Sequence, residues 1–397
     1  LPDVLIEHII ARVPRTNHPE ISLVSKLFRR IIASPELRLT RSHLAISEHV
    51  LYALLAFPSH PPSWYILNAS LRLRRVNTLP PMPSGSAVVT IGHEIYVIGG
   101  SNGSEYLTSV TVVDCRTHTF TTLPPMPYGP AVVTVGHDIY VIGGYDGTRY
   151  LSSVTVVDCR THTCRSLPSM RVPRYRAAAG VIDGKIYVMG GCENRISKDW
   201  VEAFDLERQI WLGTGGEVSD ESGGFVTYDV VKDKIYALGL RQSLHVCEPK
   251  EGGVIIIWEG DASELRGLWQ GSSCVVDDLL YTIDPMCWRG HPIIVFDPEE
   301  GVEGVWKPVK GVYGLPLCFP WFAYESKMAN VGGKLVILIG NQSWLWNYYG
   351  YKYIWCVEIA LERRQGGEIW GRVESVDVVF KTAESSPIIE LCRTVIV

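Results

Sequence analysis

Two identical segments carry the residues best suited to bind a metal ion. Both read SVTVVDCRTHT, at residues 109–119 and 153–163. The two Cys-x-x-His pairs are Cys115 with His118 and Cys159 with His162. Zn²⁺ takes thiolate and imidazole ligands, but a structural zinc site needs four of them and each segment supplies two. We therefore interpret both segments as copies of one turn, and expect no metal site and no bound cofactor.

No other pattern in the chain indicates a catalytic centre. It contains no HExxH or P-loop string, which would supply a zinc site or a phosphate cradle. Isolated histidines such as His245 and His291 are more often hydrogen-bonded structural groups than catalytic ones. The ten cysteines include no CxxC pair and do not indicate a disulfide framework. The sequence favours a binding protein over an enzyme, in a reducing compartment, the cytoplasm and/or the nucleus.

The two Cys-x-x-His segments belong to a repeat of about 44 residues. Residues 87–100 read AVVTIGHEIYVIGG, and residues 131–144 read AVVTVGHDIYVIGG. Further copies, increasingly degenerate, begin the units at 177–191, 225–239, 272–284 and 328–340. A period of this length that reads strand, Gly-Gly, strand is typical of a β-propeller blade. The short turns rich in Gly and Asp between the strands suit hairpins. The chain is therefore predicted to be mostly β.

Glycines and aromatic residues identify the type of repeat. A tyrosine follows the Gly-Gly pair, at Tyr106 and Tyr150, and an aromatic residue such as Trp211 or Trp306 closes the fourth strand. This pattern resembles the kelch repeat, clearly over residues 85–214 and more weakly beyond them. The resemblance implies a kelch-type β-propeller, in which large aromatic side chains fill the wedges between neighbouring sheets.

The two ends of the chain are expected to close the ring. Residues 49–57, 64–68 and 75–83 resemble the second, third and fourth strands of a blade that lacks its first strand. The isolated apolar segment 388–397 (IIELCRTVIV) is expected to supply it, since that pairing removes two exposed sheet edges. Seven blades result, with six as the alternative. The predicted propeller covers residues 45–397, with a closing blade that combines 45–84 and 387–397.

The first 44 residues differ from the rest, because they contain no glycine and no strand alternation. Their apolar spacing predicts one short helix, a second from Pro19 that carries Phe28 and Ile31, and a third from Pro35. The sequence LPDVLIEHIIARVP…ISLVSKLFRRIIASPEL resembles an F-box. An F-box is the module that docks on the Skp adaptor, and through it on cullin, in SCF-type ubiquitin ligases. The residues on that family's apolar pattern, implied to bind the adaptor, are Leu1, Pro2, Leu5, Ile9, Val13, Pro14, Leu23, Val24, Phe28 and Ile32. We expect an F-box domain over residues 1–44.

Charge and hydropathy narrow the class of partner. The net charge of −5 is too mild to favour nucleic acid. Residues 1–44 carry seven Lys and Arg against four Asp and Glu, a balance of +3 that suits an acidic partner. The longest apolar run, residues 50–57, is far too short to span a membrane, and no signal peptide is visible. We expect neither a nucleic acid nor a membrane as a partner.

The order of the two modules suggests a function. An F-box followed by kelch repeats resembles the plant substrate receptors of SCF-type ubiquitin ligases. The resemblance implies an adaptor that holds the ligase through the F-box and an unknown protein substrate through the propeller. A kelch scaffold without a ligase role and a kelch-type metal-dependent enzyme or specifier protein remain as alternatives. The iron-binding pattern of specifier proteins, ExxxDxxxH, is absent from the sequence.

One face of a kelch propeller combines the loops after the Gly-Gly strands with the connections between blades. The residues predicted to bind substrate on that face are Asn102, Tyr145, Asp146, Asn194 and Arg195, with Arg174, Tyr175 and Arg176 from one connection. Because alternate residues of an extended segment point the same way, Arg174 and Arg176 are both expected to enter the mouth of the central channel and to bind a carboxylate or phosphate. The aromatic insertion at residues 342–353 either packs on the rim or forms a second patch.

Overall fold

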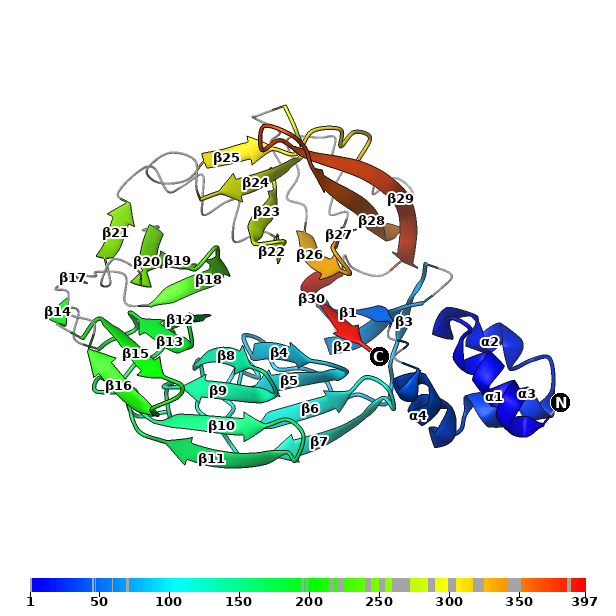
Figure 1. Cartoon of the computed structure of the whole chain (residues 1–397), viewed down its shortest axis with the longest axis horizontal. Helices are drawn as coiled ribbons and strands as arrows, with labels where there is room; N and C mark the ends of the chain where they lie inside the picture. The colour runs from blue at the N-terminus through cyan, green and yellow to red at the C-terminus, as the bar shows by residue number, and fades with distance from the viewer. Residues whose placement is uncertain are drawn as a thin grey trace.

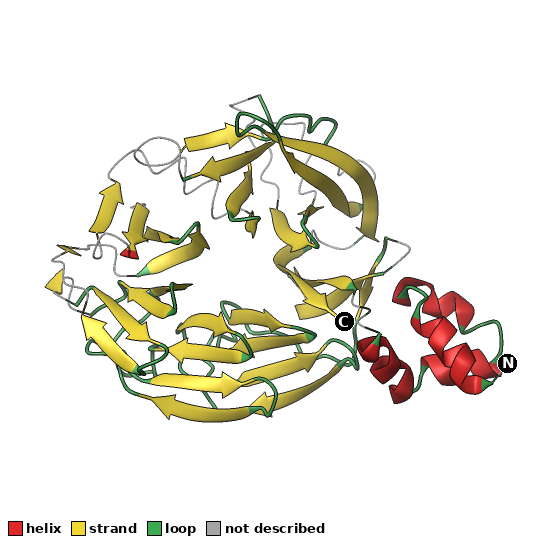
Figure 2. Cartoon of the chain, in the orientation of Figure 1, coloured by secondary structure: helices red, strands yellow, loops and turns green. Residues whose placement is uncertain are grey.

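The structure, a computed structural model, is described for residues 2–397 except 45, 47, 59, 69–70, 194–195, 198, 214–217, 220–223, 240–243, 250–253, 259–271, 285–289, 299–304, 317–324, 341–350 and 384–386. In this part of the chain, short helices precede seven four-stranded sheets. Figure 1 shows the sheets as blades of a ring around a central opening, and Figure 2 shows the N-terminal helices grouped outside the ring. The predicted propeller with a helical N-terminus is confirmed, with seven blades.

The helical segment is divided more finely than expected. Its elements are α1 Asp3–Ala11, the 3-10 turn η1 Arg15–Asn17, α2 His18–Ile21, α3 Lys26–Ile32 and α4 Pro35–His43. Ser25 caps α3, since its hydroxyl accepts a hydrogen bond from the Phe28 N–H at 3.1 Å. This cap starts a new helix, so the prediction of one helix from Pro19 through Ile31 is wrong. The helix predicted to begin at Pro35 is confirmed.

Each internal blade runs from an inner strand at the opening to an outer strand at the rim (Figure 1). The first three blades are β4 Ala87–Ile91, β5 Glu94–Ile98, β6 Val110–Asp114 and β7 Thr119–Leu123; β8 Ala131–Val135, β9 Asp138–Ile142, β10 Val154–Asp158 and β11 Thr163–Leu167; and β12 Ala178–Ile182, β13 Lys185–Met189, β15 Val201–Asp205 and β16 Ile210–Gly213. The next three are β18 Phe225–Val231, β19 Lys234–Gly239, β20 Leu244–Glu248 and β21 Val254–Trp258; β22 Ser273–Val276, β23 Leu279–Ile283, β24 Ile293–Asp297 and β25 Val305–Pro308; and β26 Glu325–Val331, β27 Lys334–Gly340, β28 Lys352–Arg363 and β29 Ile369–Thr382. A short separate ladder pairs β14 Ile196–Ser197 with β17 Val218–Ser219.

The closing blade combines the two ends of the chain. From rim to opening its strands are β3 Leu73–Arg75, β2 His60–Leu67, β1 His49–Phe57 and β30 Ile388–Ile396. The antiparallel register of β30 places Ile396 opposite His49, which confirms the predicted composite blade. The fourth strand, expected at residues 75–83, instead ends at Arg75. The segment after it packs Val76, Leu79 and Met82 into the contact with the next blade.

Hydrophobic cores lie between the blades. At the contact between the closing blade and the β4–β7 blade, Tyr52 and Trp64 pack with Ile95 and Val113. Among the described residues there are seven such clusters, and an eighth, of Ile10, Ala11, Ile31 and Leu37, lies within the helices. Strand alternation explains this arrangement, because each blade presents one row of apolar side chains to each neighbour.

Gly143 and Gly144 show why the blades need glycine after the second strand. Their φ angles are +64° and +111°. A Cβ atom on Gly143 would lie 2.6 Å from the Arg174 carbonyl oxygen, and one on Gly144 would lie 2.5 Å from the Cβ of Pro127. Both neighbours belong to connections between blades, so the Gly-Gly pair allows those connections to approach the loop closely.

Glu48 joins the helices to the ring. Its carboxylate accepts a hydrogen bond from the Arg15 backbone N–H at 2.9 Å and pairs with the Arg41 guanidinium at 2.5 Å. Its backbone N–H and C=O each bond to Val397, after β30, at 3.0 Å. The helices therefore attach beside the closing blade, as Figure 1 shows.

Strand direction separates the two faces of the ring. The Ile396 N–H, at the end of β30, donates to the Gly92 carbonyl in the β4–β5 turn at 2.9 Å. The Gly-Gly loops and the connections between blades lie at the opposite ends of the inner strands. The helices therefore attach on the face opposite to those loops.

Candidate binding surfaces

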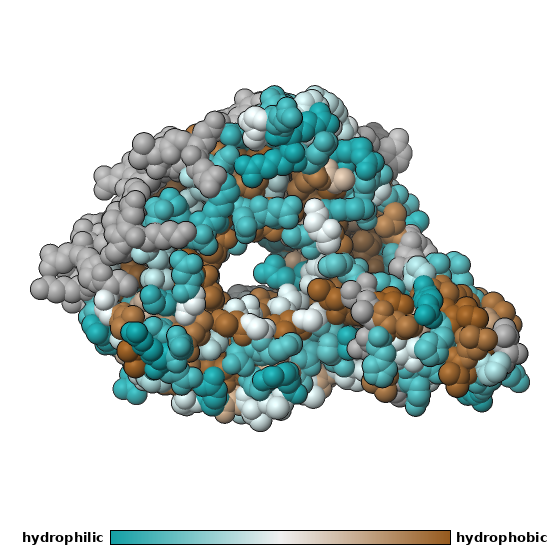
Figure 3. Space-filling view, viewed as in Figure 1, coloured by the Kyte–Doolittle hydropathy of each residue, from teal (hydrophilic) through white to brown (hydrophobic). Residues whose placement is uncertain are grey.

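Five large apolar side chains on α1 and just after α2 face solvent. On α1 the exposed fractions are 66% for Val4, 46% for Leu5 and 50% for Ile9. After α2 they are 75% for Leu23 and 69% for Val24. Figure 3 shows hydrophobic side chains gathered over the helices at one edge of the molecule. Single exposed apolar residues are ordinary, whereas a group of them indicates an interaction site. We call these five side chains the helical surface.

The other residues that the F-box resemblance implied lie in different settings. Pro2 and Pro14 are exposed, and Val13 is half-buried. Phe28 and Ile32 pack against the small core of the helices, so much of each side chain is used inside the module. Leu1 lies outside the described residues.

Five tyrosines and one arginine gather on the opposite face, where the Gly-Gly loops meet the connections between blades. Tyr106 stacks on Tyr128, with ring centres 4.4 Å apart. The Tyr175 ring lies between 5.3 and 5.9 Å from three other tyrosine rings. The Arg176 guanidinium lies 5.3 Å from the Tyr175 ring centre and donates to the Tyr128 hydroxyl at 3.4 Å. We call this group the tyrosine–arginine cluster: Tyr106, Tyr128, Tyr145, Tyr150, Tyr175 and Arg176.

The tyrosine–arginine cluster borders the central opening. Tyr128 and Arg176 line a cavity of about 560 Å³, together with the first residues of several inner strands. The opening is visible in Figure 3. Tyr106 is 57% exposed, and burial raises the pKa of Tyr175 to about 12, so its hydroxyl stays neutral at physiological pH. Flat aromatic faces beside an exposed guanidinium are the chemistry enriched in protein-binding hot spots.

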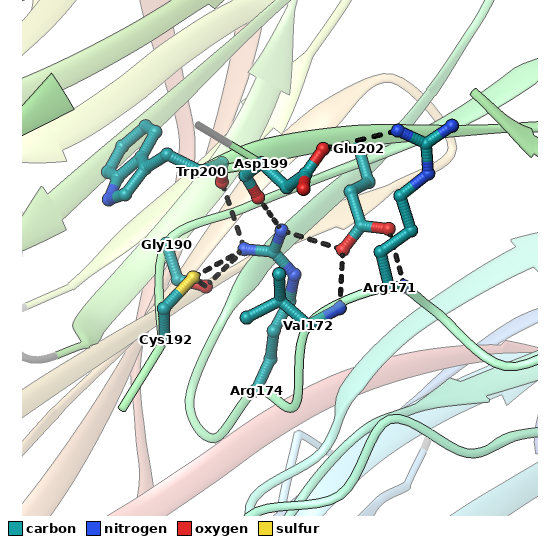
Figure 4. A network of polar contacts seen from close by, with 8 residues as sticks. All are labelled: Arg171, Val172, Arg174, Gly190, Cys192, Asp199, Trp200 and Glu202. Atoms are coloured by element: carbon teal, nitrogen blue, oxygen red, sulfur yellow. Dashed lines mark hydrogen bonds and ion pairs between the residues drawn. The ribbon is translucent and has the colours of Figure 1, made fainter. Parts of the chain in front are cut away.

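Arg174 does not belong to this exposed group, because its side chain is fully buried. Its Nη1 donates to the carbonyl oxygens of Gly190 and Trp200 at 2.8 and 2.9 Å. Its Nη2 pairs with Glu202 at 2.9 Å, and that carboxylate also accepts the Arg171 backbone N–H at 2.7 Å (Figure 4). The prediction that Arg174 enters the channel mouth is wrong, since a buried carboxylate and the backbone carbonyls of Gly190, Asp199 and Trp200 hold it inside the blade.

The backbone explains why the two arginines diverge. Arg176 has a φ of +53°, which interrupts the alternation of an extended segment. Its N–H donates to the Gly129 carbonyl at 3.0 Å, while the Tyr175 N–H donates to the Gly191 carbonyl at 2.9 Å. A Cβ atom on Gly129 would lie 2.5 Å from the Tyr175 ring. The connection is thus tied to loops of two neighbouring blades, and that fixes the direction of each side chain.

Two predicted substrate residues shape their own loops. The Asn102 side-chain oxygen accepts hydrogen bonds from the N–H groups of Ser104 and Glu105 at 3.0 and 2.9 Å. Asp146 occupies the same place in the next repeat and accepts bonds from the hydroxyl and N–H of Thr148, at 2.6 and 2.8 Å. These bonds lower the pKa of Asp146 to about 2. Both side chains order the loops that carry tyrosines of the cluster.

Other predicted recognition residues lie outside the described residues. These are Asn194, Arg195 and most of the aromatic insertion at 342–353. At the described end of the insertion, the Lys381 Nζ lies 3.9 Å from the Tyr351 ring centre, a cation–π contact with β29. Both interpretations of the insertion therefore stay predictions.

The duplicated Cys-x-x-His turns connect neighbouring blades. Both cysteines are buried, which raises the pKa of each thiol. The His118 Nε2 lies 2.8 Å from the Tyr52 hydroxyl of the closing blade. The His162 Nε2 lies 3.0 Å from the Glu94 carboxylate of the β4–β7 blade. Among the described residues, no group of three or more His, Cys, Asp or Glu is placed to hold a metal ion.

A kelch propeller carrying an F-box is the class that this architecture defines, and comparison with known proteins agrees. The F-box domain matches residues 1–40, the Kelch motif residues 82–127, and the FKB95 Kelch-repeats domain residues 120–380. Kelch repeat-containing protein At1g19470 of Arabidopsis thaliana is 42% identical over 99% of this chain and 85% of its own length. F-box/kelch-repeat protein At2g29830 of the same plant is 41% identical over 100% of this chain and 92% of its own length. The chain belongs to the family of F-box/kelch-repeat proteins.

Sequence reasoning missed part of the tyrosine–arginine cluster. Tyr106 and Tyr150 were interpreted as kelch packing residues, yet they join Tyr128 beside the predicted Tyr145 and Tyr175. Their recurrence at one place in successive repeats was the available signal, because equivalent loops of neighbouring blades lie side by side.

No helix in the described part of the chain is long and apolar enough to cross a membrane.

Proposed function

We propose that this chain is a substrate-recognition adaptor of an SCF-type cullin–RING ubiquitin ligase. Its F-box domain, residues 1–44, would bind a Skp-type adaptor, and its propeller, residues 45–397, would bind a protein substrate. The observation that carries the proposal is the presence of two exposed surfaces of different chemistry on opposite faces of one ring. The proposal assigns the chain itself no catalytic step.

The helical surface supports the adaptor contact. Leu5 and Ile9 lie one helical turn apart on α1 and are each about half exposed, so they present an apolar stripe to a partner. The helices carry a charge balance of +3 over residues 1–44, which favours an acidic adaptor. Because the small helical core lies on the other side of α1, at Ile10 and Ala11, a partner can cover the stripe without unpacking the module.

The tyrosine–arginine cluster supports the substrate contact. Tyr106 and Arg176 are exposed, whereas Tyr128 is buried beneath them and holds both through a stacked ring and a hydrogen bond. Tyrosine and arginine side chains fixed in this way lose little conformational freedom on binding. The face is also open to the central cavity, so a loop or terminus of a protein substrate can enter it.

Affinity capture from plant extract with the proteasome inhibited tests the proposal. Wild type is compared with a variant carrying Tyr106→Ala and Arg176→Ala, and with Arg160→Ala, an exposed arginine on the opposite face. We expect the double variant to lose specific captured proteins and Arg160→Ala to retain them. All three should bind a recombinant Skp-type adaptor equally. Identical captured sets for wild type and the double variant would contradict the assignment of the substrate face.

A further inference from the structure

A second cavity lies where the F-box meets the ring. It has a volume of about 390 Å³, and its polar lining consists of Arg15, His18, Ser22, Arg41 and Arg116. Apolar side chains of the helices form its other walls, with Val397 from the end of β30. The lining holds three arginines and no acidic residue. We call this cavity the junction pocket.

Among the described residues, only one of the three arginines forms a direct ion pair. Arg41 is buried, pairs with Glu48 and donates to the Ala11 and Val13 carbonyls at 2.8 and 2.9 Å. Arg15 contacts Glu48 through its backbone N–H alone. Among the described residues, neither the Arg15 guanidinium nor that of Arg116 forms a hydrogen bond or ion pair. In the described part of the chain, both half-buried guanidinium groups therefore line the cavity without a directly bonded carboxylate.

The duplicated turn offers an internal comparison for Arg116. Arg160 stands at the same place in the next repeat, and its Nε and Nη2 bond to the Asp158 carboxylate, both at 3.3 Å. Arg116 follows the same Asp-Cys sequence, yet its guanidinium lines the junction pocket instead. The backbones match, since His118 and His162 both have a φ of +55°. The neighbouring F-box, and not the sequence of the turn, therefore distinguishes the two arginines.

The electrostatics of the pocket favour an added negative charge. Burial lowers the pKa of Arg15. Tyr52 and the Glu48 carboxylate raise it, whereas the charges of Arg41 and Arg116 lower it, and the net direction is downward. Burial and Arg41 also lower the pKa of His18, so it is neutral and its Nε2 donates to the Val13 carbonyl at 3.1 Å. The positive charges in the pocket thus oppose one another, and an anion between them would relieve both the repulsion and the desolvation.

We propose that the junction pocket binds a phosphate-bearing anion between Arg15 of the F-box and Arg116 of the propeller. A planar guanidinium donates two parallel hydrogen bonds to phosphate oxygens, which makes arginine pairs selective for this group. The cavity volume accommodates more than one phosphate group. Because the two arginines belong to different modules, the bound anion links the F-box to the ring. The site lies on the face opposite the tyrosine–arginine cluster and does not depend on the substrate.

Calorimetric titration of the full chain with inorganic pyrophosphate tests the proposal, with sodium chloride of equal ionic strength as the blank. We expect saturable binding at one site. Arg15→Gln and Arg116→Gln should each weaken it about tenfold or more, as for loss of a charge-assisted hydrogen bond. Arg116→Lys, which keeps the charge without the planar fork, should weaken it less. Arg160→Gln is the matched control and should leave it unchanged, and circular dichroism verifies the fold of each variant.

A parallel titration with a phosphoserine peptide distinguishes the source of the phosphate. Binding of pyrophosphate alone assigns the pocket to a small free anion, whereas binding of the peptide alone assigns it to a phosphorylated segment of a partner. Either result supports a phosphate site if Arg116→Gln weakens it. Absence of binding by both probes above the chloride blank, or equal loss in Arg160→Gln and Arg116→Gln, would overturn the proposal.

Discussion

The two proposed binding surfaces differ in what holds them in place. The helical surface consists of aliphatic side chains on a module whose buried core has four residues, Ile10, Ala11, Ile31 and Leu37. The tyrosine–arginine cluster consists of loop side chains, set by hydrogen bonds between blades and by the buried Arg174–Glu202 pair of the same connection. A surface on a helix depends on local spacing, whereas a surface on loops depends on the whole ring. Changes to the ring should therefore impair binding at the tyrosine–arginine cluster more than binding at the helical surface.

Removal of residues 388–397 is expected to have the largest effect, because it breaks the frame that keeps the two faces apart. It takes away β30, leaves β1 with an open edge and removes the backbone partner of Glu48. We expect the cooperative thermal transition to disappear and the protein to aggregate, as measured by calorimetry and light scattering. A soluble truncated protein that melts cooperatively would contradict this role of β30.

Arg174→Met tests the scaffold near the tyrosine–arginine cluster. It leaves the Glu202 carboxylate buried without its counter-charge, so the free energy of unfolding should fall by about 3–5 kcal/mol. Addition of Glu202→Gln should recover much of that loss, because the uncompensated charge is removed. Arg176→Met, two residues away and exposed, is the matched control and should change stability by about 0.5 kcal/mol or less. Urea denaturation measures all three, and equal effects of Arg174→Met and Arg176→Met would show that the buried pair has no structural role.

Introducing negative charge on the helical surface should affect only the F-box face. Leu5→Glu with Ile9→Glu places two carboxylates on the apolar stripe, and we expect capture of a recombinant Skp-type adaptor to weaken about a hundredfold or more. The melting temperature should not change, since both side chains are about half exposed. The control variant, Ile210→Glu with Val305→Glu, alters similarly exposed apolar residues on outer strands. Undiminished capture by the Leu5/Ile9 variant would move the adaptor contact elsewhere.

A smaller effect is expected from pH, and His18 should contribute the part that acts on the helices. Burial and the charge of Arg41 lower the pKa of His18 in the folded state. As pH falls, the His18 side chain of the unfolded chain is therefore protonated at a higher pH than that of the folded chain. The stability that neutral His18 contributes is present above the ordinary histidine pKa and is lost as pH falls from that value towards the lower pKa of the folded state. Melting temperatures between pH 7 and pH 5 should fall more steeply for wild type than for His18→Gln. Parallel curves would contradict this account.

Repeated and local signals made most of the fold predictable. The copies of the Gly-Gly unit predicted the blades, and the unpaired apolar segment at 388–397 predicted β30. The F-box resemblance named Leu5 and Ile9, and both are about half exposed on α1. In each case the sequence signal lies within a few residues or recurs at a fixed period, so the element can be predicted without knowledge of tertiary contacts.

The candidate sites were less predictable because they depend on contacts between distant residues. The position of the Arg174 side chain follows from its ion pair with the buried Glu202 carboxylate. The direction of the Arg176 side chain follows from a left-handed φ angle, which the residue type does not predict. The junction pocket brings Arg15 against Arg116, from different modules. Identical sequences around Arg116 and Arg160 have different surroundings, which a repeat pattern alone cannot distinguish.

A bridging experiment tests the central claim most directly. A recombinant Skp-type adaptor is immobilised, loaded with the full chain and then presented with a protein that the wild type captures. We expect the wild type to hold this protein on the adaptor, and the Tyr106→Ala/Arg176→Ala variant to stay on the adaptor without it. The Leu5→Glu/Ile9→Glu variant should leave the adaptor yet still bind the protein in solution. A variant that loses both contacts would contradict an adaptor with two independent faces. So would the result that both variants keep both contacts.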